Sequence, residues 1–216
     1  MSITHHIDTS TLMSFAAGSL GEALSAVTAA HLDMCAACRA ELCLLDEIGS
    51  ALVDDLAPSP LDSAPPTMQL RRLEAEVRAE APAVARSGSD VPLPLQRFIG
   101  ARLDDVSWSR LGIGVWQHRL RLSSKASGDL RLLRIAPGRA VPEHGHTGNE
   151  MTLVLKGAYS DALGTFRRGD LADLDEEIEH QPVADAQEGC ICLVASDAPL
   201  RFKGLMGRLT QPFTRI

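Results

Sequence analysis

The stretch GRAVPEHGHTGNEMTLVLKG, residues 138–157, decides the fold of the second half of the chain. In an extended strand His144 and His146 point to the same face, because side chains alternate with a period of two. A turn over residues 147–149 can then return Glu150 to the same point. A fourth ligand is expected from a later strand, where His180 in EEIEHQPV is available. Imidazoles combined with one carboxylate suit zinc, iron, manganese or nickel.

The segments around this stretch are short and rich in Val, Ile, Leu and Trp. They are separated at short intervals by Gly, Pro and Asp, a spacing typical of an all-β sandwich or barrel. The clearest predicted strands are GVWQHRLRL at 114–122, RLLRIA at 131–136, MTLVLKGAY at 151–159 and CICLVA at 190–195.

The first half of the chain is predicted to be helical. Apolar residues recur there at helical spacing, as with Leu45, Ile48 and Leu52. We expect a short helix capped by Thr9 or Ser10 and ending near residue 18, and three more over about 21–31, 35–55 and 68–80. APSPLDSAPP at 57–66 breaks the pattern, and APAVARSGSDVPLP at 81–94 is the best linker candidate. The predicted domains are 1–88 and 97–216, joined by a linker at 89–96.

A second metal motif lies in the helical half, where His31, Cys35 and Cys38 form H-x3-C-x2-C. A turn between two helices can bring one imidazole and two thiolates together, as tetrahedral zinc requires. The fourth ligand can come from either His5 or His6, which lie upstream of the first helix. A redox C-x-x-C is the alternative, but no thioredoxin-like βαβ pattern surrounds it. Because a small helical domain has a modest core, we expect the zinc to be structural.

Charge is distributed unevenly along the 216 residues. Residues 1–80 hold 12 acidic side chains against 4 basic ones, whereas residues 81–216 hold 16 against 17. An acidic surface repels phosphate backbones, so we expect no direct nucleic-acid binding and a basic protein partner instead. The sequence has no apolar run of membrane-spanning length and no secretory signal at its start, and a cytoplasmic protein is expected.

The other histidine, tryptophan and cysteine candidates are expected to have structural roles. His118 is expected to be a structural histidine on a strand, and Trp108 and Trp116 to be core or domain-interface aromatics. Cys190 and Cys192 share one strand face, which favours buried core thiols over a redox pair near the metal.

Residues 138–157 resemble the first motif of the cupin family, G-x5-H-x-H-x3-E-x6-G, at every fixed position. The second cupin motif usually has a Pro before its histidine and an Asn after it, and GDLADLDEEIEHQ has neither. Together with H-x3-C-x2-C and an upstream histidine, the whole chain from MSITHHIDTSTL to QPFTRI resembles the ChrR-type anti-sigma factors, in which a zinc anti-sigma domain is fused to a cupin. The resemblance implies a multidomain protein, an all-α zinc domain followed by an all-β cupin barrel.

The same resemblance implies the roles of the site residues. His6, His31, Cys35 and Cys38 would hold structural zinc, and His144, His146, Glu150 and His180 a second divalent metal, with zinc as the first candidate. The helical domain would sequester one extracytoplasmic-function sigma factor, and the cupin would receive an oxidative or photo-oxidative signal. The alternatives are a cupin dioxygenase or isomerase with a helical assembly domain and, less favoured by its charge, a zinc DNA-binding regulator.

Overall fold

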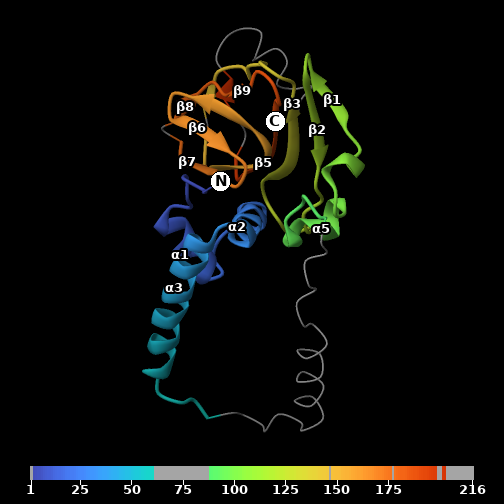
Figure 1. Ribbon diagram of the computed structural model, residues 1–216. Helices are drawn as coiled ribbons and strands as arrows, with labels where there is room; N and C mark the ends of the chain where they lie inside the picture. Colours follow the sequence, from blue (N-terminus) through green and yellow to red (C-terminus); the bar gives the residue numbers. More distant parts are fainter. Residues whose placement is uncertain (1, 61–87, 146, 177, 199–200, 203–216) are drawn as a thin grey trace.

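The computed structural model describes residues 2–60, 88–145, 147–176, 178–198 and 201–202. Three helices come first and a region of antiparallel strands follows (Figure 1). The helix expected over 68–80 lies outside the described residues. The helices are α1 (Thr9–Ala16), α2 (Glu22–Met34), α3 (Ala36–Asp54) and α5 (Leu93–Ile99), with a 3-10 turn at Leu103–Asp105.

The helix ends follow from local chemistry. The carboxylate of Asp8 accepts a hydrogen bond from the backbone N–H of Ser10 at 2.8 Å, so Asp8 caps α1 in place of the expected Thr9 or Ser10. Cys35 is at once the C-cap of α2 and the N-cap of α3. Its extended backbone, with φ −106° and ψ 110°, turns the chain sharply between the two helices. This corner lies within the H-x3-C-x2-C motif.

The segment expected to be a linker, 89–96, is partly ordered against the core. Pro92 immediately precedes α5 and Pro94 lies in its first turn, where the fixed φ of proline fits a helix, and Val91 and Leu95 are buried. The backbone N–H of Leu93 donates to Asp33 at the end of α2 over 3.0 Å. The start of α5 is therefore bound to the end of α2.

The described strands pair antiparallel throughout. One sheet of eight strands has the order β1-β2-β3-β10-β5-β6, with β7 and β9 also paired to β5, and a smaller sheet has the order β11-β4-β8. These pairings do not close the larger sheet into a ring. The strands are β1 (Ser109–Gly112), β2 (Val115–Arg119), β3 (Asp129–Ile135), β4 (His144–Gly145), β5 (Glu150–Asp161), β6 (Gly164–Arg167), β7 (Leu171–Leu174), β8 (Glu179–His180), β9 (Val183–Ala184), β10 (Cys190–Ser196) and β11 (Arg201–Phe202).

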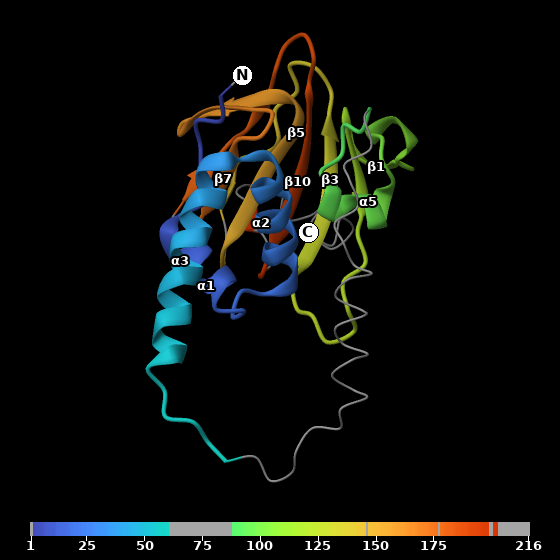
Figure 2. The same ribbon diagram turned by 60° about the horizontal axis from the view of Figure 1, so that its bottom comes forward.

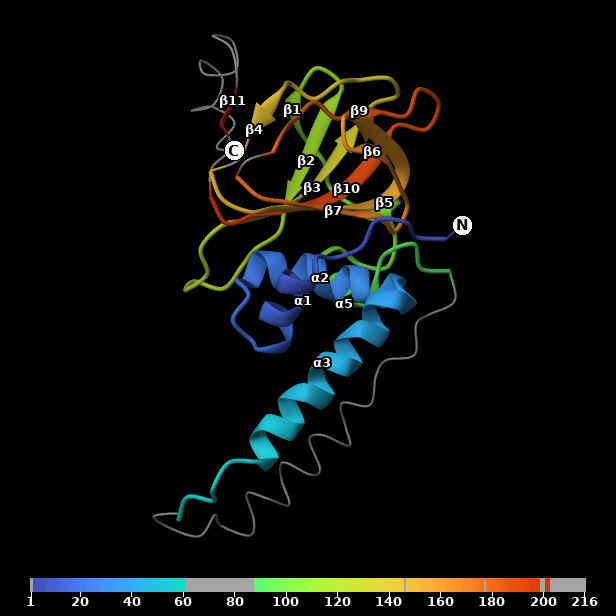
Figure 3. The ribbon, with the colours of Figure 1, turned by 90° about the vertical axis from the view of Figure 1, so that its left-hand side faces the viewer.

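The helical region packs directly on the sheet. Figure 2 shows α2 lying across β5, β10 and β3, while Figure 3 shows α3 projecting away from the strands. Val27 of α2 and Leu193 of β10 are fully buried in the same apolar cluster. At the start of α2 Glu22 accepts from the backbone N–H of Ser123 at 2.9 Å, and in the middle of the helix Thr28 contacts Met151. Burial of apolar surface therefore holds the two regions together.

Two candidate metal centres

Four side chains converge at the corner between α2 and α3. The Nε2 atom of His31 lies 3.3 Å from the Sγ atom of Cys38, and the Nδ1 atom of His6 lies 3.3 Å from Cys35 Sγ and 3.5 Å from Cys38 Sγ. All four donor atoms lie within 4.8 Å of one another. Donors around tetrahedral zinc are about 3.5 Å apart, given zinc bonds of about 2.0 to 2.3 Å. The cluster thus fits a zinc ion.

Burial shifts the pKa values of two of these groups in the direction that leaves them uncharged in the absence of a cation. His31 and both thiols are buried, whereas His6 is exposed. Burial lowers the pKa of His31 to about 4, opposed by the nearby main chain of Gly169, so the imidazole is neutral near pH 7. Burial also raises the pKa of Cys38 to about 11, which keeps the thiol protonated until a metal displaces its proton.

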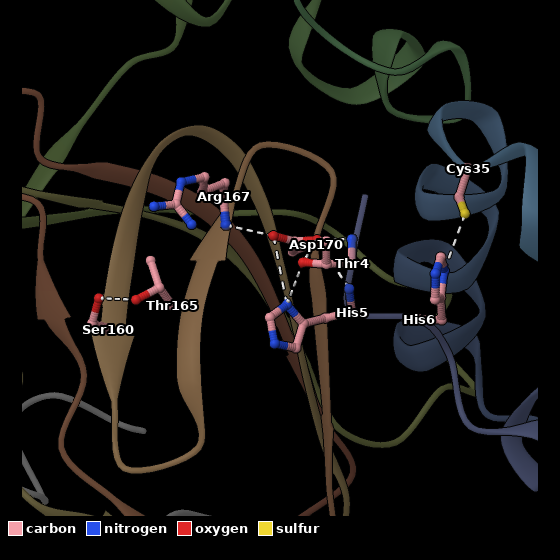
Figure 4. Close-up of polar contacts among 8 residues, drawn as sticks. All are labelled: Thr4, His5, His6, Cys35, Ser160, Thr165, Arg167 and Asp170. Atoms are coloured by element: carbon pink, nitrogen blue, oxygen red, sulfur yellow. Dashed lines mark hydrogen bonds and ion pairs between the residues drawn. The ribbon is translucent and has the colours of Figure 1, made fainter. Parts of the chain in front are cut away.

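His6 and not His5 lies beside the thiols. His5 points the other way, toward the strands, where its ring packs on Phe166 with centroids 4.2 Å apart. Figure 4 shows the two neighbouring histidines diverging from the chain, His6 toward Cys35 and His5 toward Asp170. Of the two histidines left open by the sequence, the structure brings His6 to the other three predicted residues.

The second cluster lies where β4, β5 and β8 meet. His144 and His180 are cross-strand partners, with their Nε2 atoms 3.2 Å apart, and Glu150 at the start of β5 completes a group within 4.8 Å. All three are buried. His146 lies outside the described residues. Three of the four predicted cupin residues therefore converge.

The outer nitrogens of these histidines are held by acceptors. His144 Nδ1 donates to the carbonyl of Pro142 over 2.9 Å, and His180 Nδ1 to Asp161 Oδ2 over 2.8 Å. The His180 and Asp161 side chains are only 2% and 0% exposed. Because each Nδ1 is a donor, each Nε2 presents a lone pair to the site.

Electrostatics at this cluster also favour a bound cation. Burial lowers the pKa of His144 to about 4, opposed by the Pro142 carbonyl. Burial raises the pKa of Glu150 to about 7, opposed by the Thr152 hydroxyl and by Arg131. A divalent ion would stabilise the ionised carboxylate and the neutral imidazoles together, so the donor set fits a metal.

Asp161 was not foreseen from the sequence. It lies 19 residues before His180, at the end of β5, and its other oxygen accepts from the backbone N–H of Leu163. Nothing in a local pattern marks such an acid, because the same side chain would serve equally well in an ordinary hairpin turn.

The other candidates lie away from both clusters. His118 on β2 interacts through Nδ1 with the Ser107 carbonyl at 2.8 Å, which confirms a structural histidine. Trp108 and Trp116 are half-buried and line a recess of about 410 Å³. Cys190 and Cys192 are buried in the apolar cluster of the strands, as expected for core thiols.

Comparison with known proteins decides the family. Residues 96–199 match the family model of the ChrR cupin-like domain. The anti-sigma-E factor ChrR of Cereibacter sphaeroides is 44% identical over 216 residues, which is 100% of both chains. The chain belongs to the ChrR family of anti-sigma factors. This confirms the family predicted from its two motifs.

A solved structure agrees with this membership. The crystal structure of Rhodobacter sphaeroides SigE in complex with the anti-sigma ChrR matches with a TM-score of 0.74 and 41% identity, over 91% of this chain and 100% of that one. Both relatives of the ChrR family are named as regulators, so they support the regulatory interpretation over the cupin enzyme. In the described part of the chain, no helix is long and apolar enough to cross a membrane.

Proposed function

We propose that this protein is an anti-sigma factor that binds one extracytoplasmic-function sigma factor through its helical region and thereby blocks transcription. The observation that carries the proposal is the likeness over the whole chain to an anti-sigma factor whose relative was solved with its sigma factor. The two candidate metal centres would bind the metals, and the exposed face of α3 would contact the sigma factor.

The exposed face of α3 is suited to a protein partner. Leu44, Ile48 and Leu52 follow one another at intervals of four residues on α3 and are 59–65% exposed. Residues four apart lie on the same side of a helix, so these side chains form one apolar stripe. Stripes of this kind on a projecting helix are typical of protein contacts. The acidic balance of residues 1–80 would favour approach of a basic, nucleic-acid-binding partner.

Zinc would be held by His6, His31, Cys35 and Cys38. The ion would cross-link the start of the chain to the corner between α2 and α3 and so fix the direction in which α3 projects. The four protein donors leave no open position, which suits a structural role.

A second divalent metal, zinc first among the candidates, would be held by His144, His146, Glu150 and His180. We propose that the cupin domain responds to an oxidative or photo-oxidative signal and then releases the sigma factor. The strands would form the barrel of a cupin, residues 97–216, after a helical domain at 1–88, and the protein would act in the cytoplasm. If sensing depends on the metal, His144→Ala with Glu150→Ala abolishes oxidant-induced release from the purified complex, and release that survives both changes would refute metal sensing.

Capture of the sigma factor tests the proposal. We would co-express the full chain with candidate sigma factors from the same genome and purify the complex. Ile48→Glu with Leu52→Glu is expected to abolish capture, because two charges interrupt the stripe. Ile113→Glu, which alters a side chain 73% exposed in the turn between β1 and β2, is the matched control and leaves capture intact.

Two results would count against the proposal. Wild-type chain that captures none of the candidates contradicts it, and metal-dependent oxygen uptake with small substrates would then favour a cupin enzyme. Equal loss of capture in the Ile113 control would show that the α3 variant acts through general charge and not through the stripe.

A further inference from the structure

The side chain of Asp170, in the turn between β6 and β7, faces the start of the chain. Its carboxylate is 3% exposed and accepts hydrogen bonds from the backbone N–H groups of Thr4 at 2.7 Å and His5 at 3.0 Å. The other oxygen accepts from the backbone N–H of Arg167 at 2.8 Å (Figure 4). One buried carboxylate thus joins the cupin turn to residues 165 or more positions away.

Residues 3–8, which we call the N-terminal strap, continue this attachment along the edge of β7. The backbone N–H of Leu171 donates to the His5 carbonyl at 3.2 Å, and that of Asp8 donates to Asp173 at 3.2 Å. A Cβ at Gly169, where φ is +93°, would lie 2.7 Å from the end of the Ile3 side chain, so Ile3 packs directly on this turn. The strap is therefore bound to the cupin by main-chain and side-chain contacts on both sides of His6.

The strap carries His6. The residues on both sides of His6 are held by the cupin, His5 through Asp170 and Ile7 through burial in the shared core. The imidazole of His6 is exposed, and the described residues show no other hydrogen bonds to it than those to the two thiols. Its position is thus set by the strap and not by packing around its own ring.

The same turn also faces the second histidine of the cluster. His31 Nδ1 is buried and has no hydrogen-bond partner of ordinary geometry within the described residues. The main chain of Gly169, next to Asp170, is close enough to act on this ring and raises the pKa that burial lowers. The β6–β7 turn therefore contacts the strap that carries His6 and also lies close to the ring of His31.

We propose that Asp170 is a positioning residue for the N-terminal metal centre, holding the strap so that His6 faces Cys35 and Cys38. The inference rests on the proposed zinc site and deepens it, because it makes the cupin part of that site. Coupling of this kind is reciprocal: if docking of the strap strengthens metal binding, metal binding strengthens docking by the same factor. A rearrangement of the β6–β7 turn would then loosen zinc and change the direction of α3, which is a route from cupin to sigma factor.

Cobalt binding to the full chain tests this role. Co²⁺ held by cysteine thiolates gives a ligand-to-metal absorption band, which reports the N-terminal centre separately from a centre of nitrogen and oxygen donors. Competition with a chelator of known affinity then gives the dissociation constant. Groups that orient metal ligands typically contribute about 10- to 100-fold to affinity. We expect Asp170→Ala to weaken Co²⁺ binding by about 10-fold or more and Asp170→Asn, which keeps an acceptor oxygen, to weaken it less.

The matched control is Asp185→Asn. Asp185 also accepts two backbone N–H bonds, from Gln187 and Glu188, but within one exposed turn of the cupin. It should leave the absorption band and the affinity unchanged. Far-UV circular dichroism of each variant checks the fold, and Asp170→Asn keeps the test usable if Asp170→Ala does not fold.

A double-mutant cycle separates positioning from general stability. If Asp170 acts through His6, Asp170→Asn has no further effect on Co²⁺ affinity in a His6→Ala chain. Wild-type affinity in both Asp170 variants, or effects of Asp170 and His6 that add, would overturn the proposal. Sigma capture by the wild-type chain is measured separately, so failure of the anti-sigma function and failure of this coupling give different results.

Discussion

Replacement of Asp161 should weaken metal binding at the cupin cluster without removing any ligand. The Asp161–His180 bond is 2.8 Å long between side chains that are 0% and 2% exposed, so bulk water does not compete for it. Asp161→Asn keeps an oxygen acceptor but loses the charge, and we expect a loss of about 10-fold. Asp161→Ala leaves the His180 N–H unpaired in the interior, and a loss of about 100-fold is expected, equivalent to about 2.7 kcal/mol.

Metal content measured after dialysis against chelators of increasing strength gives these affinities. The N-terminal centre serves as an internal reference, since neither variant touches it. Ser160→Ala, which removes the exposed contact to Thr165 in the same hairpin, controls for local disturbance of β5 and β6. Wild-type affinity in both Asp161 variants would refute the reasoning that this carboxylate orients His180.

Three further changes test other parts of the structure. Gly157→Ala places a Cβ against the Gly189 carbonyl at a φ of +71°, and thermal unfolding should show a loss of stability of about 3 kcal/mol. The control Gly138→Ala, where φ is +66° and the space around the Cβ is open, should lose only about 1 kcal/mol. Equal losses in the two variants would contradict the clash. Burial raises the pKa of Asp173, opposed by Thr11 and the Asp8 N–H, so its folded state binds extra protons and loses stability as pH rises from about 3.8 through that raised pKa. Asp173→Asn should therefore gain stability relative to wild type as the pH rises above about 3.8 in urea unfolding, and a constant difference would count against this. Cys38→Ser should remove one equivalent of metal and reduce helical content while the cupin metal remains, and an unchanged metal content would show that Cys38 holds none.

The two motifs could be found from sequence because their spacing is short and tied to local geometry. Period-two alternation and one turn suffice to bring His144 and Glu150 together, and a helix corner suffices for His31 and Cys38. The convergence was predicted, and the role of these residues as ligands stays a prediction. The family followed from the combination of motifs, which either motif alone does not determine.

Contacts between residues far apart in the sequence could not be predicted, for a physical reason. Asp170 and Asp161 are ordinary turn acids whose partners lie 165 and 19 residues away, so no local pattern marks them. The predicted linker at 89–96 overlaps the start of α5, because the prolines at 92 and 94 favour a loop in the sequence and yet proline also suits the first turn of a helix. A closed barrel was expected, and the described pairings show the antiparallel cupin sheet only.

The apolar cluster shared by α2 and the sheet has a consequence for how the family can diverge. Because Val27 and Leu193 are buried in the same cluster, a substitution on one side alters the space available to the other. Recombination that joins the helices of one relative to the strands of another would therefore create mismatched volumes across α2. The two halves should be inherited as a pair, and natural shuffling of sensors onto this helical region should succeed only when α2 travels with its sheet.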